Sequence, residues 1–521
     1  MTNNTSLFTS PTGKSYAVTF ALVSSLFLLW GFCNGMIDVM DKHFQRELHL
    51  TLAQSAWVQF AHYLGYFLMA MPAGWFASKL GYKGGIIAGL LMVAIGGFWF
   101  IPASKIATFP AFLLGVCVIA SGLTFLETVA NPYTTVLGPK QFAATRINLA
   151  QSCNGIGWIL GPIAGARFFY GQDAGGQSTG AQTLWIPYAA IGGFVLVLAI
   201  VFSFCKLPDI KSQDEFHLDD TGPSGDLPVA HRGVAFGLLW LNIVVLSVAV
   251  GMILSAFTTF PAVSQALGLT EYQVLWYSSA MLLAIGTVIF VLKNADISNH
   301  SIWTHPHFSG ATLTQFFYVA AQCSIFAYFI NYMTSQIPPV PDAWHAGWFG
   351  NWFEIHNNGI LGLSDKGAST LASVAFGFFL AGRVIGAGLL KKFPAHKVLA
   401  TFAALSGLCS LLVFLNFGWL SASALFLTYF FMSIMFPTIF SLGIYGLGGR
   451  AKKASSFIVM AIMGGAIMPK LMGHVADKHG MSAGFIVPLV CFILVGCYGF
   501  FWSHLSGTEG VTGTSVAKNR P

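Results

Sequence analysis

The chain has 521 residues, of which 55% are hydrophobic and only 8% are charged, with a mean hydropathy of +0.70 and a formal net charge of +7. Soluble domains carry about 25% charged residues. The composition therefore excludes soluble enzyme classes and indicates an integral membrane protein. The eight cysteines fall inside apolar runs without CxxC spacing, so we expect neither a disulfide framework nor a metal centre.

Apolar runs of about 20 residues can cross a bilayer as helices. Fourteen such runs follow one another, and both termini are expected on one side of the membrane because that number is even. The predicted spans are 17–40, 54–78, 84–104, 110–137, 144–170, 184–206, 234–256, 271–293, 309–333, 366–391, 396–416, 421–446, 453–475 and 482–504.

Lysine and arginine in the connections predict the orientation, because they concentrate on the cytoplasmic side. With both termini inside, 17 of the 25 lie on the cytoplasmic side and only 6, such as Lys42 and Arg46, on the outer side. We therefore expect a multi-pass protein of the cell (inner) membrane with both termini cytoplasmic.

An internal repeat indicates two related halves. Pro132 and Pro437 each precede a glycine by six residues, in NPYTTVLG and FPTIFSLG. Six spans per half leave the pair 234–293 as an insertion, which we expect at the periphery. The expected units are a first bundle over 1–206, a linker with two extra helices over 207–308, a second bundle over 309–506 and a tail over 507–521.

Two carboxylates, Asp38 and Glu127, lie well inside these predicted spans. An acid at membrane depth usually faces a cavity and serves a function. Asn34 precedes Asp38 by four residues, and Asn131 follows Glu127 by four, so each pair shares a helix face. These residues predict a polar pocket that faces a cavity and binds a ligand, with a purely structural role for the two carboxylates as the alternative.

The span 144–170 carries a polar stripe formed by Asn148, Gln151 and Asn154. Amides and aromatic rings suit a polyhydroxylated ligand, because hydroxyls take hydrogen bonds and sugar C–H faces stack on rings. Helix–helix hydrogen bonding is the alternative. From the second half we expect Tyr318 and Gln322 to contact the ligand, with Phe436 as another stacking face.

Two further residues allow a structural interpretation as well as a functional one. Arg383 could pair with a carboxylate or with a helix end, and His62 could relay protons or be an ordinary buried histidine. No P-loop appears in the sequence, which removes ATP-driven transport on this chain alone.

Several stretches together resemble the L-fucose permease family of fucose:proton symporters and glucose/galactose porters, within the major facilitator superfamily. They are WGFCNGMIDVMDKHFQ around Asp38, GLTFLETVANPYTTVLGP around Glu127, RINLAQSCNGIG, KKFPAHKVLA and FMSIMFPTIFSLGI. The resemblance implies a twelve-helix core, alternating access and proton-coupled sugar uptake. It places the essential carboxylates at Asp38 and Glu127, and sugar-cavity amides at Asn34, Gln151 and Asn154. Where the family reads NNLND, this chain has NGMID, with Gly35 and Ile37 in place of amides.

The predicted fold is thus an all-α major facilitator fold of two six-helix bundles plus an inserted pair. The predicted function is import of a monosaccharide together with H⁺, without a cofactor, a metal or nucleic acid, by a monomer that is not an enzyme. Na⁺-coupled or facilitative transport, or sugar sensing without transport, are the alternatives.

Overall fold

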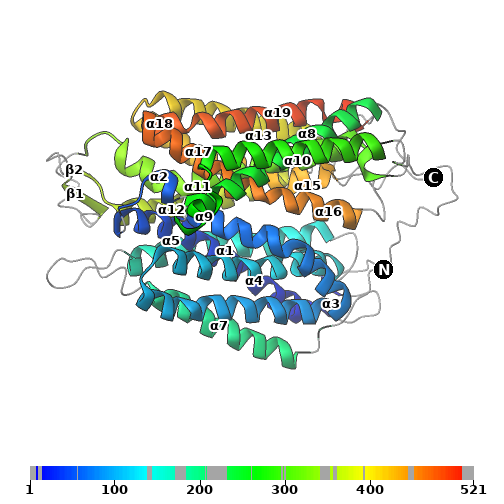
Figure 1. Ribbon diagram of the computed structural model, residues 1–521. Helices are drawn as coiled ribbons and strands as arrows, with labels where there is room; N and C mark the ends of the chain where they lie inside the picture. Colours follow the sequence, from blue (N-terminus) through cyan, green and yellow to red (C-terminus); the bar gives the residue numbers. More distant parts are fainter. Residues whose placement is uncertain are drawn as a thin grey trace.

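The computed structural model describes residues 15–47, 49–55, 57–137, 143–169, 184–205, 232–259, 261–294, 301–340, 352–355, 361–390, 393–443 and 451–506, with residues 8, 9, 207 and 297. The side chains of some helical residues, Asp38 and Asn131 among them, lie outside this described part. Long helices dominate it (Figure 1).

The first half, defined here as α1 to α7, is a bundle of helices that pack mainly on one another. Its elements are α1 (Ala17–Glu47), α2 (Leu52–Ser55), α3 (Trp57–Ile106), α4 (Phe109–Val136), α5 (Ala143–Phe169) and α7 (Trp185–Phe204). The backbone of α3 is not helical at Gly81, which has φ 70° and ψ −179°. Only glycine adopts this φ readily, so two expected spans, 54–78 and 84–104, become the two arms of α3.

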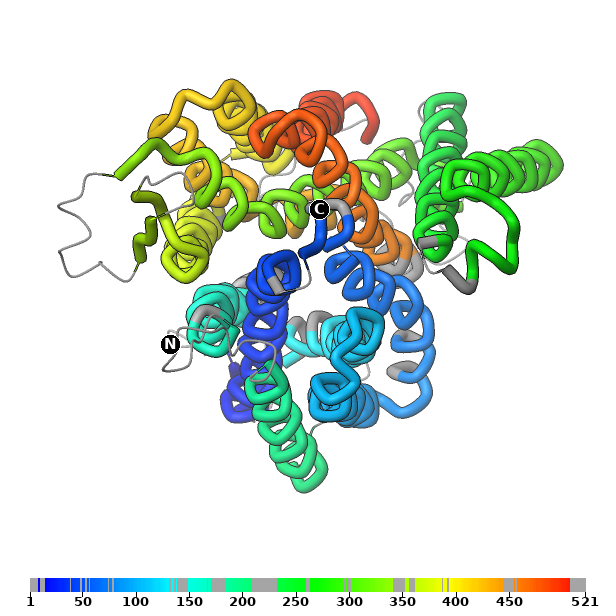
Figure 2. The backbone as a smooth tube through the Cα atoms, turned by 60° about the vertical axis from the view of Figure 1, so that its left-hand side comes forward, coloured from blue at the N-terminus to red at the C-terminus, as the bar shows by residue number. Residues whose placement is uncertain are grey.

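The second half, defined here as α11 to α19, packs beside the first (Figure 2). Its elements are α11 (Pro306–Ser335), β1 (Phe353–Ile355), β2 (Leu361–Leu363), α12 (Asp365–Leu390), α13 (Ala395–Leu415), α14 (Trp419–Met432), α15 (Met435–Gly443), α16 (Ala451–Met460), η7 (Ala461–Met463), α17 (Gly464–His479), α18 (Met481–Gly484) and α19 (Ile486–Ser506). The strands pair antiparallel, with Phe353 opposite Leu363. This small hairpin, which an all-α prediction misses, lies at one end of the molecule, called the hairpin end below (Figure 1).

The inserted segment contains α8 (Arg232–Ala256), η2 (Phe257–Thr259), α9 (Pro261–Leu267) and α10 (Glu271–Lys293), and η3 (Ile302–Thr304) follows it. Figure 2 shows α8 and α10 outside both bundles, beside the second half. In the most apolar 18-residue stretch of each helix, only 22% of α8 and 11% of α10 is buried inside the protein. This low burial confirms the predicted peripheral position. The Asn242 amide of α8 donates to the Ser309 carbonyl of α11 at 2.8 Å, and thereby attaches the pair to the second half.

Among the described residues, twelve helices rather than the expected fourteen are long and apolar enough to cross a membrane. The two expected spans missing from that set, 54–78 and 144–170, are helical nonetheless, as the first arm of α3 and as α5. Polar residues, such as His62 in one and Gln151 in the other, lower their hydropathy. A helix covered by neighbouring helices does not need a wholly apolar surface.

The predicted end of the first span is also wrong. The span was expected to end at residue 40, before the charged residues Asp41 and Lys42, but α1 continues to Glu47. Asp41 is fully buried and lies inside the apolar helix Ala17–Arg46. Packing against other helices, which the local sequence does not reveal, covers this carboxylate.

Candidate functional site

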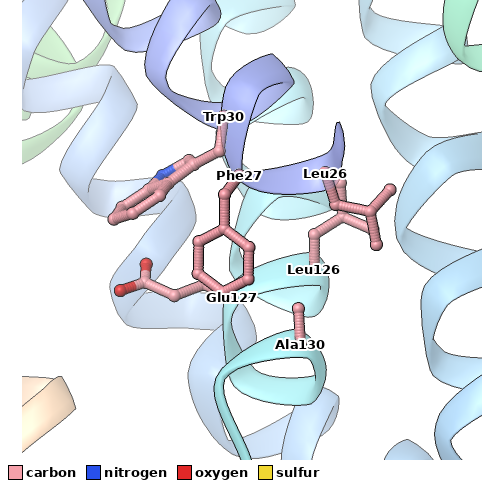
Figure 3. A pocket seen from close by; sticks show the side chains of 6 residues that line it. All are labelled: Leu26, Phe27, Trp30, Leu126, Glu127 and Ala130. Carbon is pink, nitrogen blue, oxygen red and sulfur yellow. The ribbon is translucent and has the colours of Figure 1, made fainter. Parts of the chain in front are cut away.

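The first half contains a buried polar cluster formed by α1, α3 and α4. Asn34 of α1, His62 of α3 and Glu127 of α4 are 6%, 2% and 8% exposed. Glu127 also lines a small hollow, together with Leu26, Phe27, Trp30, Leu126 and Ala130, where its carboxylate lies beside the rings of Phe27 and Trp30 (Figure 3). The predicted carboxylate at membrane depth therefore lies among aromatic rings.

Several polar atoms of this cluster lack hydrogen-bond partners. The Trp30 indole N–H donates to the Tyr66 hydroxyl, which is also within hydrogen-bonding reach of Asn34. Within the described part of the chain, however, Asn34 Oδ1, His62 Nδ1 and Glu127 Oε2 are buried without a partner. Most buried polar atoms in proteins are paired. Three unpaired atoms close to aromatic rings are what a site for a polar ligand would present.

The second half contributes a broken helix held by a tyrosine and an arginine. The helix is interrupted at Ser433 and Ile434, between α14 and α15. The Tyr318 hydroxyl donates to the Met432 carbonyl at 2.9 Å, and Arg383 Nε donates to the Ser433 carbonyl at 3.3 Å. Irregular backbone at membrane depth is tolerated where protein groups or a water-filled cavity pair it. Arg383 thus binds a helix end, one of the two predicted uses.

Arg383 also joins the halves. Its Nη1 donates to the backbone carbonyl of Gln151 at 3.2 Å and to Gln151 Oε1 at 3.4 Å. Its guanidinium lies 4.8 Å from the centre of the Phe379 ring. Gln151 of the predicted amide stripe therefore lies at the contact between α5 and α12.

Asn154 lies one turn further along α5, and it packs on α1. Its Nδ2 donates to the Phe27 carbonyl at 3.3 Å, and it is 1% exposed. A Cβ added at Gly31 would lie 2.0 Å from the Asn154 carbonyl oxygen, so only glycine permits this close approach of the two helices. In this conformation the geometry of Asn154 matches the helix-packing alternative.

The other predicted site residues are placed as follows. Asp38 is in α1 and Asn131 in α4, with side chains outside the described part. Tyr318 is fully buried, whereas Phe436, its edge-on neighbour at 6.4 Å between ring centres, is partly exposed. Gln322 is partly exposed one turn after Tyr318.

Contacts between the halves extend from the hairpin end toward the middle of the molecule. Lys42 and Arg46 of α1 lie 3.7 and 3.6 Å from the carboxylate of Asp365, the first residue of α12. The Ser369 hydroxyl donates to the Pro162 carbonyl at 3.0 Å. The two halves are therefore held together at the hairpin end.

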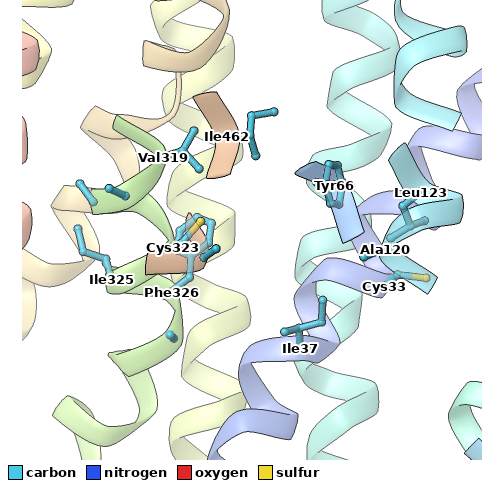
Figure 4. Close-up of a cluster of buried hydrophobic side chains, with 14 of the residues drawn as sticks. Cys33, Ile37, Tyr66, Ala120, Leu123, Val319, Cys323, Ile325, Phe326 and Ile462 are labelled. Carbon is cyan, nitrogen blue, oxygen red and sulfur yellow. The ribbon is translucent and has the colours of Figure 1, made fainter. Parts of the chain in front are cut away.

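Farther from the hairpin end, the two halves meet through aromatic rings and a cysteine thiol. The Trp158 ring of α5 lies 4.8 Å from that of Phe376, and Cys323 of α11 donates to the Tyr63 hydroxyl at 2.8 Å. Figure 4 shows the same facing arrangement, with Tyr66 and Ile37 of the first half opposite Cys323 of the second. The polar cluster is thus covered on the hairpin side.

The sequence did not single out Trp30, Tyr66 or Asp41. The two rings were indistinguishable from many other aromatics in apolar helices. The spacing of Asp41, three residues after Asp38, would have been a signal, but the predicted span ended just before it.

The fold and the site define a multi-pass membrane protein with two helical halves and a polar site between helices. The family model described as Major Facilitator Superfamily matches residues 15–333. The L-fucose-proton symporter of Escherichia coli (strain K12) is 33% identical over 493 residues, covering 94% of each chain. The chain therefore belongs to the Major Facilitator Superfamily, and is a membrane transporter rather than an enzyme.

Other relatives extend the comparison. The glucose/galactose transporter of Brucella abortus biovar 1 (strain 9-941) is 26% identical, covering 96% of this chain and 98% of its own. A crystal structure of the superfamily transporter FucP in the outward conformation has a TM-score of 0.58 at 29% identity, covering 94% of this chain and 100% of that one. The resemblance predicted from the sequence is confirmed.

Proposed function

We propose that this protein is a secondary active transporter that imports a monosaccharide together with H⁺ by alternating access. The observation that carries the proposal is the set of buried atoms on Asn34, His62 and Glu127 that have no partner among the described residues, with the rings of Phe27 and Trp30 beside the Glu127 carboxylate. Sugar hydroxyls would supply the missing hydrogen bonds, and a ring would stack on the C–H face. Relatives named for L-fucose-proton symport and glucose/galactose transport support the substrate class.

We assign the proton-coupling role to Asp38 and Glu127. A carboxyl group in an apolar surrounding can hold or release a proton as solvent access changes. Glu127 suits this role because its buried Oε2 has no partner among the described residues. For Asp38 the proposal rests on its position in α1, one turn beyond Asn34.

We assign sugar contacts to four amide residues, Asn34, Asn131, Gln151 and Gln322. Glu127 and Asp38 are assigned sugar contacts in addition to their role in proton coupling. Two residues with the same predicted role are engaged elsewhere in this conformation: Asn154 donates to Phe27, and Tyr318 donates to Met432. We infer that these two position the lining helices now and reach the sugar when the halves rearrange. Phe436, being partly exposed, is the better stacking candidate from the second half.

We further propose a monomer in the inner membrane, with both termini cytoplasmic and the hairpin end outside. The excess of Lys and Arg on the predicted cytoplasmic side supports this orientation. With the hairpin end outside, the contacts between the halves at that end make the present conformation closed toward the outside. A cysteine at Ser264, in a cysteine-free background, should then react with an impermeant thiol reagent added outside. Reaction only after the membrane is opened would contradict the orientation.

Uptake into membrane vesicles tests the function. A panel of labelled hexoses is offered with a pH gradient, with a Na⁺ gradient and with neither. Accumulation above equilibrium with the pH gradient alone is the expected result. Accumulation only with Na⁺, or equilibration without accumulation, would replace H⁺ coupling by the sodium-coupled or facilitative alternative. Sugar binding without any flux would indicate a sensor.

A further inference from the structure

A second buried polar network lies near the hairpin end, away from Glu127. Asp41 of α1 is fully buried, and Gln45 Nε2 donates to its Oδ1 at 3.4 Å. The same Gln45 nitrogen donates to the Ser55 hydroxyl of α2 at 2.8 Å. Gln45 Oε1 accepts from Asn331 Nδ2 of α11 at 2.6 Å. The network therefore links α1, α2 and α11, and crosses from the first half to the second.

Asp41 has an unfilled position within this network. Its Oδ2 is buried, with no hydrogen-bond partner in the described part of the chain. In proteins, the burial of an ionised carboxylate without full pairing costs several kcal/mol of free energy. Either a cation or a proton must offset that cost while the network is closed.

Lys42 attracts the Asp41 carboxylate through space, but no ion pair joins the two in the described part of the chain, and the other nearby groups do not supply a cation either. On α1 itself, Lys42 and Arg46 pair with Asp365 of α12. His43 packs against the rings of Phe44 and Phe169. From α11 the facing group is Tyr328, whose hydroxyl donates to the Pro469 carbonyl at 3.0 Å. The other carboxyl group that acts on this tyrosine, Asp477 of α17, is itself acidic.

We propose that Asp41 is a proton-binding site of the closed hairpin end, separate from Glu127. When α1, α2 and α11 close around it, the carboxylate takes one proton from water on that side and becomes neutral. When the halves separate there, water reaches the carboxyl, which returns the proton to water. The inference rests on the proposed proton-coupled transport, and it adds a carboxyl group whose protonation is linked to closure.

The reporter for closure is a cysteine at Ser369 in a cysteine-free background. Ser369 is fully buried, and its hydroxyl crosses the halves to the Pro162 carbonyl at 3.0 Å. The reagent is an impermeant maleimide, added outside sealed right-side-out vesicles over a range of external pH. Rates are divided by those of the exposed reporter Gln265→Cys, so that thiol ionisation cancels.

If closure takes up one proton, the normalised labelling rate should fall up to tenfold for each unit by which the external pH drops. Asp41→Asn, whose amide imitates the neutral acid, should label slowly with a flat pH profile. Asp41→Glu should keep the slope with a displaced midpoint. A full pH slope in Asp41→Asn would overturn the proposal.

Two further variants separate the contributions. Gln45→Ala removes the contact with Asn331, so it should label faster at every pH and keep the slope. Glu127→Gln should also keep the slope, even if it abolishes sugar accumulation, so failure of the proposed function and failure of this inference are distinguishable. Loss of the slope in Glu127→Gln, with its retention in Asp41→Asn, would assign the proton to Glu127 instead. Labelling of detergent-denatured protein reports how much of each variant is present.

Discussion

The two halves use corresponding helices in different ways. In the first half α4 runs without a break through Glu127 and Pro132 to Val136. In the second half the helix that carries Pro437 is divided into α14 and α15 at Ser433. The repeat places the break of the second half where the first half carries its buried acid.

The polar groups at these two corresponding positions differ accordingly. In the second half the backbone carbonyls of Met432 and Ser433 are paired by Tyr318 and Arg383. At the corresponding position of the first half the helix is unbroken, and the side-chain atom Glu127 Oε2 is buried without a partner among the described residues. An arginine keeps its charge at all physiological pH values, whereas a carboxylic acid can change its charge. The comparison suggests a first half that titrates and a second half that supplies a fixed charge.

The largest effect is expected at the titrating position. Glu127→Gln keeps the shape of the side chain but cannot exchange a proton. A gradient of about two pH units drives about 100-fold accumulation at one proton per sugar, since each unit is worth about a factor of ten. We expect this accumulation to vanish while sugar exchange across the membrane persists. Undiminished gradient-driven accumulation would end the assignment, and Asp38→Asn, which we expect to lose uptake altogether, is the companion variant.

A smaller effect is expected at the fixed charge. Arg383→Ala removes the donors to Ser433 and Gln151, and hydrogen bonds to charged groups contribute about 1.5–3 kcal/mol each. We expect the maximal transport rate to fall by at least about tenfold without a change in its pH profile. Arg383→Lys should recover only part of the rate, because a lysine lacks the planar fork that reaches both partners. A pH profile that shifts with Arg383 would remove the contrast between the halves.

The next largest effect is expected at Gln151, which lies at the contact between the halves. Gln151→Ala removes an amide, while the backbone carbonyl that Arg383 also contacts remains. Loss of one hydrogen bond to a buried sugar hydroxyl costs about 1–3 kcal/mol, or about 5- to 150-fold in affinity. Equilibrium binding of the transported hexose measures it, at matched protein abundance. Unchanged affinity would make Gln151 a helix-packing residue, as the geometry of Asn154 already suggests for its neighbour.

The smallest effect is expected at the peripheral pair. Glu271 of α10 pairs with Lys470 of α17 at 2.5 Å, and the two side chains are 45% and 27% exposed. Exposed ion pairs contribute about 0–1 kcal/mol, so Glu271→Gln should leave transport unchanged and lower thermal stability only slightly. Thermal unfolding in detergent and hexose uptake measure the two quantities. A transport defect as large as that of Gln151→Ala would show that the inserted helices take part in the transport cycle.

The sequence predicted where the helices lie better than it predicted where they end or break. Apolar runs located the helices because lipid imposes length and hydropathy on each segment separately. Those same rules misplaced the end of α1, since Asp41 and Lys42 look like the start of a loop. They also passed over the division of α14 from α15, because MSIMFP is as apolar as a continuous helix.

The sequence by itself determined that the chain spans a membrane in two related halves, and that Glu127 is an acid at membrane depth. Those conclusions follow from composition, spacing and the cost of charge in hydrocarbon, all of which are local. Only the tertiary structure decided that Arg383 contacts Gln151, that Asn154 packs on α1, and that Asp41 is buried in a network that joins α1 to α2 and α11. Each of these depends on which helices become neighbours, and residues far apart in the chain specify that packing jointly.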